Sequence, residues 1–153
     1  MNIPKKLANV TEEDLPVKLQ QKLIQTSNRV LGGKSVLLLG ASSVEKEVFA
    51  VCLLKRVLQD NKTGLFYLAS HTLDYEEAYA TVFIGVDDLA SGYPVKKLLS
   101  TLKYIFMQGR VFILEGSSKE SLEQILGQDF MTYIIPSAVG VQFEAKRDTL
   151  EFI

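Results

Sequence analysis

The stretch Ser35-Val-Leu-Leu-Leu-Gly40, followed by Ala-Ser-Ser-Val-Glu-Lys-Glu47, reads as an apolar strand, a loop and the start of a helix. A loop in this position cradles nucleotide phosphates when it has the pattern Gly-x-x-x-x-Gly-Lys-Ser/Thr. Gly40 and Lys46 keep the spacing of the first glycine and the lysine, whereas Glu45 replaces the second glycine and Glu47 replaces the hydroxyl residue. The stretch therefore predicts a nucleotide-binding fold whose phosphate-binding loop is altered.

The two glutamates are expected to weaken phosphate binding. Two like charges about 5 Å apart repel by roughly 3 kcal/mol at an effective dielectric constant of 20, which corresponds to about two orders of magnitude in affinity. Gly40, Ser43 and Lys46 are the candidate phosphate contacts. For Lys46 two interpretations stay open: a residual phosphate contact, or a solvated lysine that pairs with Glu45 and Glu47. Changing Glu45 to Gly and Glu47 to Thr is expected to create or strengthen ATP–Mg²⁺ binding.

Composition indicates an ordinary globular chain. It has 153 residues, 47% of them hydrophobic and 23% charged, with a net charge of −1, which fits one domain and gives no electrostatic sign of nucleic-acid binding. The lone Cys52 excludes a disulfide framework and favours a reducing compartment. The N-terminal residues lack the pattern of a secretory signal, and no apolar run is long enough to cross a membrane. We expect a cytoplasmic protein with no membrane partner.

Apolar runs and helical patterns alternate along the chain. Near-continuous apolar strands separated by helices indicate a parallel sheet covered on both faces. Helices are expected at residues 16–31, 45–59, 94–108 and 118–126, with at most a short helix at 73–79, and strands at 36–39, 65–69, 81–86, 110–114 and 139–143, with residues 149–153 pairing beside the last one.

In this order of elements the chain resembles the ATPase domain of the DnaC/DnaI helicase loaders and IstB transposition helpers, a branch of the AAA+ proteins. The matching segments are Ile3–Thr11, Gly33–Gly40, Val82–Leu89, Phe112–Ser117, Leu126–Ile134 and Val141–Phe143 with Arg147. The resemblance implies a RecA/AAA+-like three-layer α/β domain with a mostly parallel five-stranded sheet in the order 5-1-4-3-2 and helices on both faces. Residues 1–153 are expected to form this single domain, without the helicase-binding domain that precedes it in full loaders and without a separate C-terminal domain.

The resemblance also implies which catalytic positions are altered. Glu47 stands in place of the residue that binds Mg²⁺, and Gly116 or Ser117 in place of the sensor asparagine. The two late arginines, one of them the finger that reaches a neighbouring subunit, correspond to Asp129 and Tyr133. We therefore expect a pseudo-ATPase with no catalytic residues and no cofactor, any binding of ATP and Mg²⁺ being weak.

Two acidic residues and a basic cluster leave alternatives open. Asp87 and Asp88 match the family's Walker B strand end and either hold Mg²⁺ through water or hold no ion. No other metal site is expected, because His71 is the only histidine and has no partner at ligand spacing. The basic cluster either touches a nucleic-acid backbone or is a solvated helix face; it comprises Lys96, Lys97, Lys103 and Arg110.

Three functions are compatible with the resemblance. The first is a non-catalytic, loader-like accessory protein in DNA replication initiation that contacts a replicative helicase, a loader or another AAA+ protein. The second is an active ATP-dependent loader or IstB-like helper. The third is a mobile-element mimic that inhibits host replication. A weak contact with single-stranded DNA and assembly with further copies of the chain are compatible with each of them.

Overall fold

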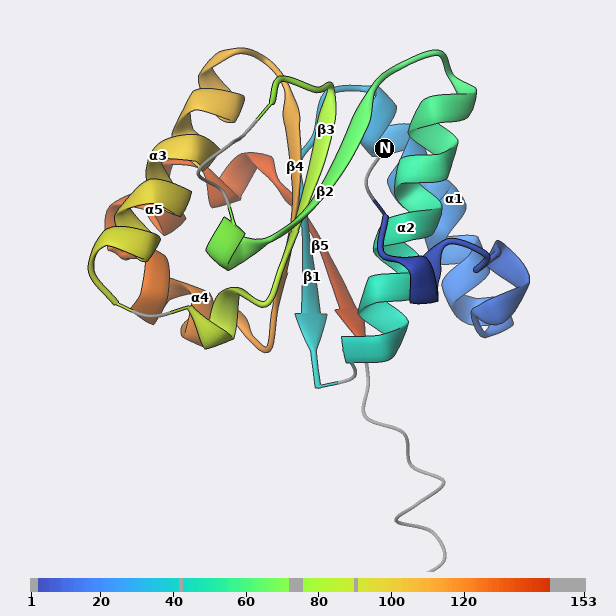
Figure 1. Cartoon of the computed structure of the whole chain (residues 1–153), viewed down its shortest axis with the longest axis horizontal. Coiled ribbons are helices and arrows are strands. Elements are labelled where there is room, and N and C mark those ends of the chain that lie inside the picture. The colour runs from blue at the N-terminus through green and yellow to red at the C-terminus, as the bar shows by residue number, and fades with distance from the viewer. Residues whose placement is uncertain (1–2, 42, 72–75, 90, 144–153) are drawn as a thin grey trace, which may run out of the picture.

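The computed structural model describes residues 3–41, 43–71, 76–89 and 91–143, without the side chains of Ser43 and His71. The described residues form one five-stranded sheet in the order β2-β3-β4-β1-β5 (Figure 1). All four neighbouring pairs are parallel, so the predicted sheet and its strand order are confirmed. The strands are β1 (Val36–Gly40), β2 (Gly64–Leu68), β3 (Ala80–Ile84), β4 (Val111–Gly116) and β5 (Val139–Phe143).

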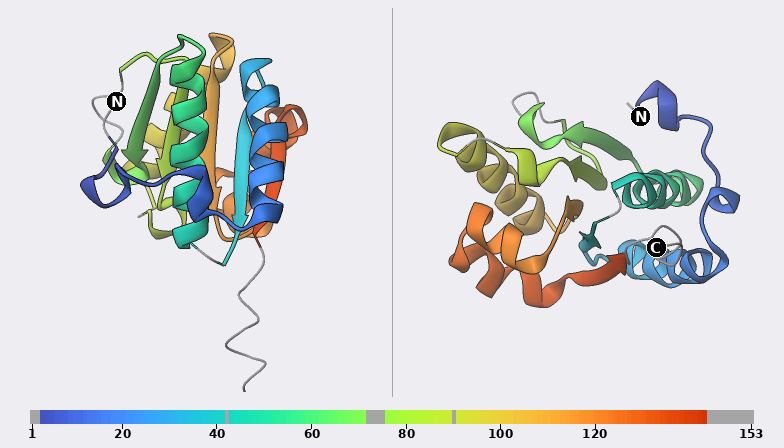
Figure 2. Two further views of the ribbon diagram at one scale, coloured as in Figure 1. Left: turned by 90° about the vertical axis from the view of Figure 1, so that its right-hand side faces the viewer. Right: turned by 90° about the horizontal axis from the view of Figure 1, so that it is seen from below.

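Helices cover both faces of this sheet, as Figure 2 shows most clearly in its right-hand view. Two helices cover one face: α1 (Val17–Leu31) and α2 (Ser43–Gln59). The other face carries α3 (Tyr93–Met107), α4 (Lys119–Leu126) and α5 (Gln128–Tyr133). This is the three-layer arrangement of a RecA/AAA+-like domain. None of the described helices is both long and apolar enough to cross a membrane.

The apolar strands divide the core into two clusters. On the α1–α2 side, Phe49 and Leu53 of α2 pack with Leu38 of β1; on the other side, Leu98 of α3 packs with Leu114 of β4. The central strands β1, β3 and β4 are buried along their whole length, which is why their sequences do not alternate between apolar and polar residues.

Several boundaries differ from the sequence-based expectations. The helix expected at residues 73–79 is not present at residues 76–79, and residues 72–75 lie outside the described part. β3 ends at Ile84, because Gly85 has a φ of +76° and begins the 3₁₀ turn η4 (Val86–Asp88). The helix α5 was not predicted. Ser118 is the N-cap of α4, since its side chain accepts a hydrogen bond from the Ser121 N–H. The strand expected at residues 149–153, and Arg147, lie outside the described residues.

Short 3₁₀ turns complete the described chain. They are η1 (Lys5–Leu7), η2 (Glu12–Asp14), η3 (Ala69–His71), η4 and η5 (Ile135–Ser137). The first two carry the N-terminal segment across α2, where Lys55 donates hydrogen bonds to the carbonyls of Ala8 and Val10.

Candidate functional site

The altered loop lies at the carboxyl edge of the sheet, where open parallel α/β sheets bind their ligands. It connects the end of β1 to the first turn of α2. The ends of β3 and β4 lie along the same edge, since β4 pairs with both β1 and β3 (Figure 1). The side chains that decide what this edge can bind therefore come from α2, β4 and the η4 turn.

Lys46, the candidate phosphate contact, is turned into the protein. Its side chain is only 4% exposed. The ammonium donates hydrogen bonds to the carbonyl oxygens of Gly40 and, at 3.1 Å, Gly116. It also lies 3.4 Å from a carboxylate oxygen of Glu115. Two of the three N–H donors of the ammonium are thus used in hydrogen bonds to backbone carbonyls, and the Glu115 carboxylate balances its charge. The interpretation of Lys46 as a solvated lysine paired with Glu45 and Glu47 is wrong, because the residue is buried and its ion pair is with Glu115.

Glu115 supplies the charge that pairs with Lys46, and the sequence pattern did not single it out as a site residue. It lies near the end of β4 and is 7% exposed. One carboxylate oxygen faces Lys46, and the other accepts a hydrogen bond of 3.0 Å from the N–H of Gly85. Glu115 thus joins three elements at the carboxyl edge. The available signal was a single carboxylate in the otherwise apolar strand Val111–Gly116.

Gly40 is held by packing against β5. Its φ is +136°, and a Cβ atom at this position would lie 2.1 Å from the carbonyl oxygen of Phe143. Its N–H donates to the carbonyl oxygen of Ser117 at 3.1 Å. The glycine that opens a phosphate-binding loop is therefore needed here for the close approach of the β5 backbone, and its N–H is used within the protein.

The remaining loop residues do not contact Lys46 through any described ion pair. Glu45 is partly buried and lines a groove of about 420 Å³ between α1 and β5, together with Lys18 and Lys22. Glu47 is partly buried on α2. Ser43 begins α2, and its side chain lies outside the described part. The carboxylate that faces Lys46 is thus contributed by β4 rather than by the loop.

Asp87 and Asp88, which the resemblance places at the Walker B strand end, lie exposed in the turn after β3. Asp87 accepts a hydrogen bond of 2.7 Å from the N–H of Ser117 and another from the hydroxyl of Ser121. The described residues contain no cluster of three His, Cys, Asp or Glu side chains able to hold a metal ion. In this structure Asp87 anchors the start of α4 to the end of β3.

The resemblance implies that Gly116 or Ser117 stands at the sensor position and that Asp129 and Tyr133 stand at the two late arginine positions. A Cβ atom on Gly116 would come within 2.7 Å of the Leu122 side chain, so Gly116 lets α4 pack closely on β4. Asp129 is exposed on α5, and Tyr133 at the end of that helix is 77% exposed. An exposed tyrosine can pack against a partner but cannot supply the positive charge of a finger.

The four basic residues do not form a single free cluster. Lys96, Lys97 and Lys103 lie on α3, where Lys96 and Lys103 are exposed and Lys97 is half-buried. Arg110 forms an ion pair of 3.0 Å with Glu77. Hydrogen bonds to Glu77 from the Tyr104 hydroxyl and from Arg110 lower the pKa of that carboxyl. Arg110 is therefore neutralised within the protein, and the three lysines remain as candidate contacts.

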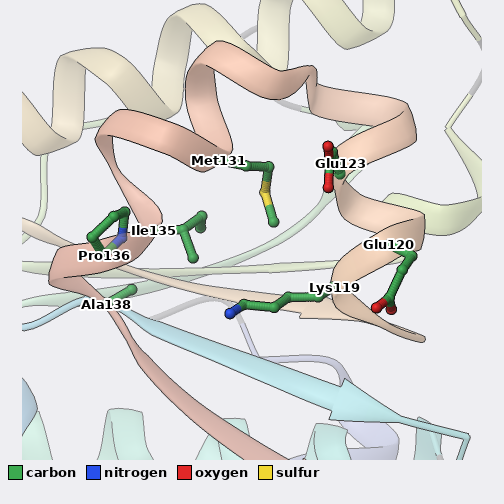
Figure 3. Close-up of a pocket in the computed structure, with 7 residues that line it drawn as sticks. All are labelled: Lys119, Glu120, Glu123, Met131, Ile135, Pro136 and Ala138. Carbon is green, nitrogen blue, oxygen red and sulfur yellow. The ribbon is translucent and has the colours of Figure 1, made fainter.

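A separate hollow of about 430 Å³ lies between α4, α5 and η5. Figure 3 shows Met131 and Ile135 pointing into it, with the Lys119 side chain running along its margin toward Ala138. Glu120 and Glu123 of α4 complete its lining with Pro136. None of these residues belongs to the loop or to the Lys46–Glu115 pair, so this hollow is distinct from the altered phosphate site.

The comparison with solved structures identifies the fold. A structure of the DnaC helicase loader matches with a TM-score of 0.71 at 15% identity, over 94% of this chain and 100% of that one. A structure of DnaI matches with a TM-score of 0.71 at 14% identity, over 94% and 92%. The chain has the AAA+ fold of the DnaC/DnaI helicase loaders. The identities are too low to carry more than the fold.

A replication initiator, DnaA bound to AMPPCP and single-stranded DNA, matches with a TM-score of 0.70 at 11% identity. The match covers 96% of this chain and 52% of that one, so the chain spans about half the length of the initiator. No family model matches the sequence, and no curated protein matches it at the sequence level. The likeness to loaders and initiators is thus a likeness of architecture.

Proposed function

We propose that the protein is a non-catalytic, loader-like accessory protein in DNA replication initiation, acting through contacts with a replicative helicase, its loader or another AAA+ protein. The observation that carries the proposal is the state of Lys46. In a loader-like fold this lysine occupies the phosphate-contacting position of the motif. Here it is buried, donates two hydrogen bonds to carbonyls of the protein and has its charge paired with Glu115.

The other altered positions support the same function. Phosphoryl transfer depends on positioned metal, nucleophile and finger groups. Here the metal-ligand position is Glu47, the sensor position is Gly116 or Ser117, and the finger position is Asp129 or Tyr133. Asp87 is occupied with the backbone of Ser117 and the hydroxyl of Ser121. Losing all three contributions together favours a binding role over turnover.

The family resemblance suggests which surface makes the contact. AAA+ domains assemble through the faces that carry the nucleotide loop and the arginine finger. Tyr133 lies on the finger-equivalent helix and is 77% exposed, and aromatic side chains are enriched among the residues that dominate protein interfaces. We therefore place a contact with the partner ATPase at Tyr133.

Binding in solution tests the proposal. Replicative helicase and its loader are immobilised separately, and capture of this chain is measured with ATP, with ADP and without nucleotide. We expect capture that is independent of nucleotide and is weakened at least tenfold by Tyr133→Ala. Met107→Ala is the matched control, because Met107 is 82% exposed and lies on α3, a different helix from the one that carries Tyr133. Capture that requires ATP on this chain would favour an active loader, and no capture by either partner would refute the proposal.

A further inference from the structure

We propose that the Glu115 carboxylate stands in for a bound phosphate, so that the protein contains a latent anion site that its own side chain keeps closed. Two donors converge on this carboxylate: the Lys46 ammonium at 3.4 Å and the Gly85 N–H at 3.0 Å. An ammonium and a backbone N–H are the donors that proteins offer to phosphate oxygens. The carboxylate oxygens of Glu115 occupy the space between them.

Burial makes this arrangement more than an incidental ion pair. Lys46 and Glu115 are 3% and 7% exposed, and a buried ammonium is strongly destabilising when its counter-charge is removed. Truncating Glu115 would leave Lys46 with two carbonyl acceptors but no anion, and would open a space next to the ammonium. That space should accept a small oxyanion, such as a terminal phosphate of a polyphosphate.

The inference revises an expectation from the sequence. Replacing Glu45 by Gly and Glu47 by Thr was expected to create ATP–Mg²⁺ binding. In the structure Lys46 is held by hydrogen bonds to Gly40 and Gly116 and by its ion pair with Glu115, none of which those changes remove. We now expect the Glu45/Glu47 double variant alone to bind inorganic tripolyphosphate no better than the unaltered chain, because Glu115 still holds the lysine.

Chemical rescue tests the inference. Thermal unfolding of Glu115→Ala is followed with sodium tripolyphosphate and with sodium chloride at matched ionic strength. The midpoint of the variant should rise by roughly 3–5 °C with tripolyphosphate at about ten times its dissociation constant, and should not rise with chloride beyond the general effect of salt. Glu123→Ala, which truncates an exposed glutamate on α4, is the control and should respond as the unaltered chain does.

A second variant identifies the lysine as the anion's contact. Lys46→Met combined with Glu115→Ala should show no rescue, because the ammonium is gone. If Glu115→Ala is folded but tripolyphosphate does not raise its midpoint above the chloride control, Glu115 is only a structural counter-ion and the inference fails. If Glu115→Ala does not fold by itself, recovery of a cooperative transition in tripolyphosphate supports the inference and failure to recover it counts against it.

A measurement on the unaltered chain tests the inference independently. Its Gly85 amide resonance in a ¹H–¹⁵N spectrum should not move when tripolyphosphate is added, because Glu115 occupies the site. Movement of that resonance would overturn the inference, since the site would then be open without any substitution. None of these measurements involves a helicase or a loader, so their outcome is separate from that of the proposed function.

Discussion

The Lys46 ammonium lies 3.4 Å from the Glu115 carboxylate, and this buried pair connects the first turn of α2 to the end of β4. A buried pair is often no more stabilising than apolar residues of the same shape, but removing one partner leaves an uncompensated charge. The pair therefore connects the loop to the sheet, and single and double substitutions can measure what it contributes to the free energy of unfolding.

Single substitution of either partner should be costly. We expect Lys46→Met or Glu115→Leu alone to lower the free energy of unfolding by about 3–5 kcal/mol, and the double variant to lose much less than the sum. Urea unfolding of the four proteins gives the coupling energy. The matched control is the partly exposed Arg56–Glu12 pair, 2.6 Å apart, whose coupling should stay below about 1 kcal/mol. Equal coupling energies for both pairs would contradict this account of burial.

ATP hydrolysis should not rise above buffer background. The family resemblance implies that the metal-ligand, sensor and finger groups are all replaced, and a finger alone contributes about 10³–10⁵ in rate. Steady-state phosphate release is the measurement. Asp88→Asn provides the control, because Asp88 is exposed in the turn after β3. Phosphate release that this substitution abolishes would show that Asp88 takes part in hydrolysis.

Gly40→Ala should be far more destabilising than Gly33→Ala. Both glycines have positive φ, but only the Cβ at residue 40 would meet another group, the Phe143 carbonyl oxygen at 2.1 Å, whereas nothing lies within 4 Å of a Cβ at residue 33. We expect losses of about 3 kcal/mol or more for Gly40→Ala and about 1 kcal/mol for Gly33→Ala. Chemical denaturation compares them, and equal losses would show that the backbone of β5 can move away.

Cys52 should be inert in the folded protein. Burial, with a smaller contribution from Glu12, raises the pKa of its thiol to about 11, so at pH 8 only about 0.1% is thiolate. We expect reaction with a thiol reagent at pH 8 only when the chain unfolds. Because the folded pKa exceeds the ordinary value of 9.0, the stability contribution is complete below pH 9 and is lost as the pH rises toward 11. Cys52→Ala should lack this alkaline loss, and an identical pH profile for both proteins would contradict the shift.

Binding of single-stranded DNA should be weak, with a dissociation constant of about 10⁻⁵ M or higher at physiological salt. The chain has 17 basic and 18 acidic residues, and Arg110 is paired with Glu77. Fluorescence anisotropy with a labelled oligonucleotide measures the affinity. Sub-micromolar binding that is lost when Lys96 and Lys97 are changed to Glu would show that α3 is a nucleic-acid surface after all.

Most helices and strands could be predicted from the local sequence pattern, and the order of the strands from the family resemblance. The apolar stretches at Val36–Gly40 and Val111–Gly116 have no polar face, which requires a sheet covered on both sides. The short helix α5 was missed because its six residues, Gln128–Tyr133, show less than two turns of periodicity. Its start follows Gly127, whose φ of +92° separates it from α4.

The sequence predicted where the candidate site lies, but it did not predict which side chain pairs with Lys46. Lys46 lies three and seven residues before Phe49 and Leu53, which places all three on the buried side of α2. Sequence spacing shows this, but it does not identify the counter-charge, which comes from a strand more than sixty residues away in the chain. Glu115 becomes the partner of Lys46 because β1 pairs in parallel with β4, where Leu38 lies opposite Glu115.

The pairing of β1 has a consequence for synthesis on the ribosome. Both of its neighbours, β4 and β5, come from the last third of the described chain. Until residues 111–143 have emerged, β1 is an apolar strand with two unpaired edges, a state that favours aggregation. The Lys46–Glu115 contact can form only after β4 arrives. In the nascent chain Lys46 would therefore have no Glu115 partner until β4 joins the sheet.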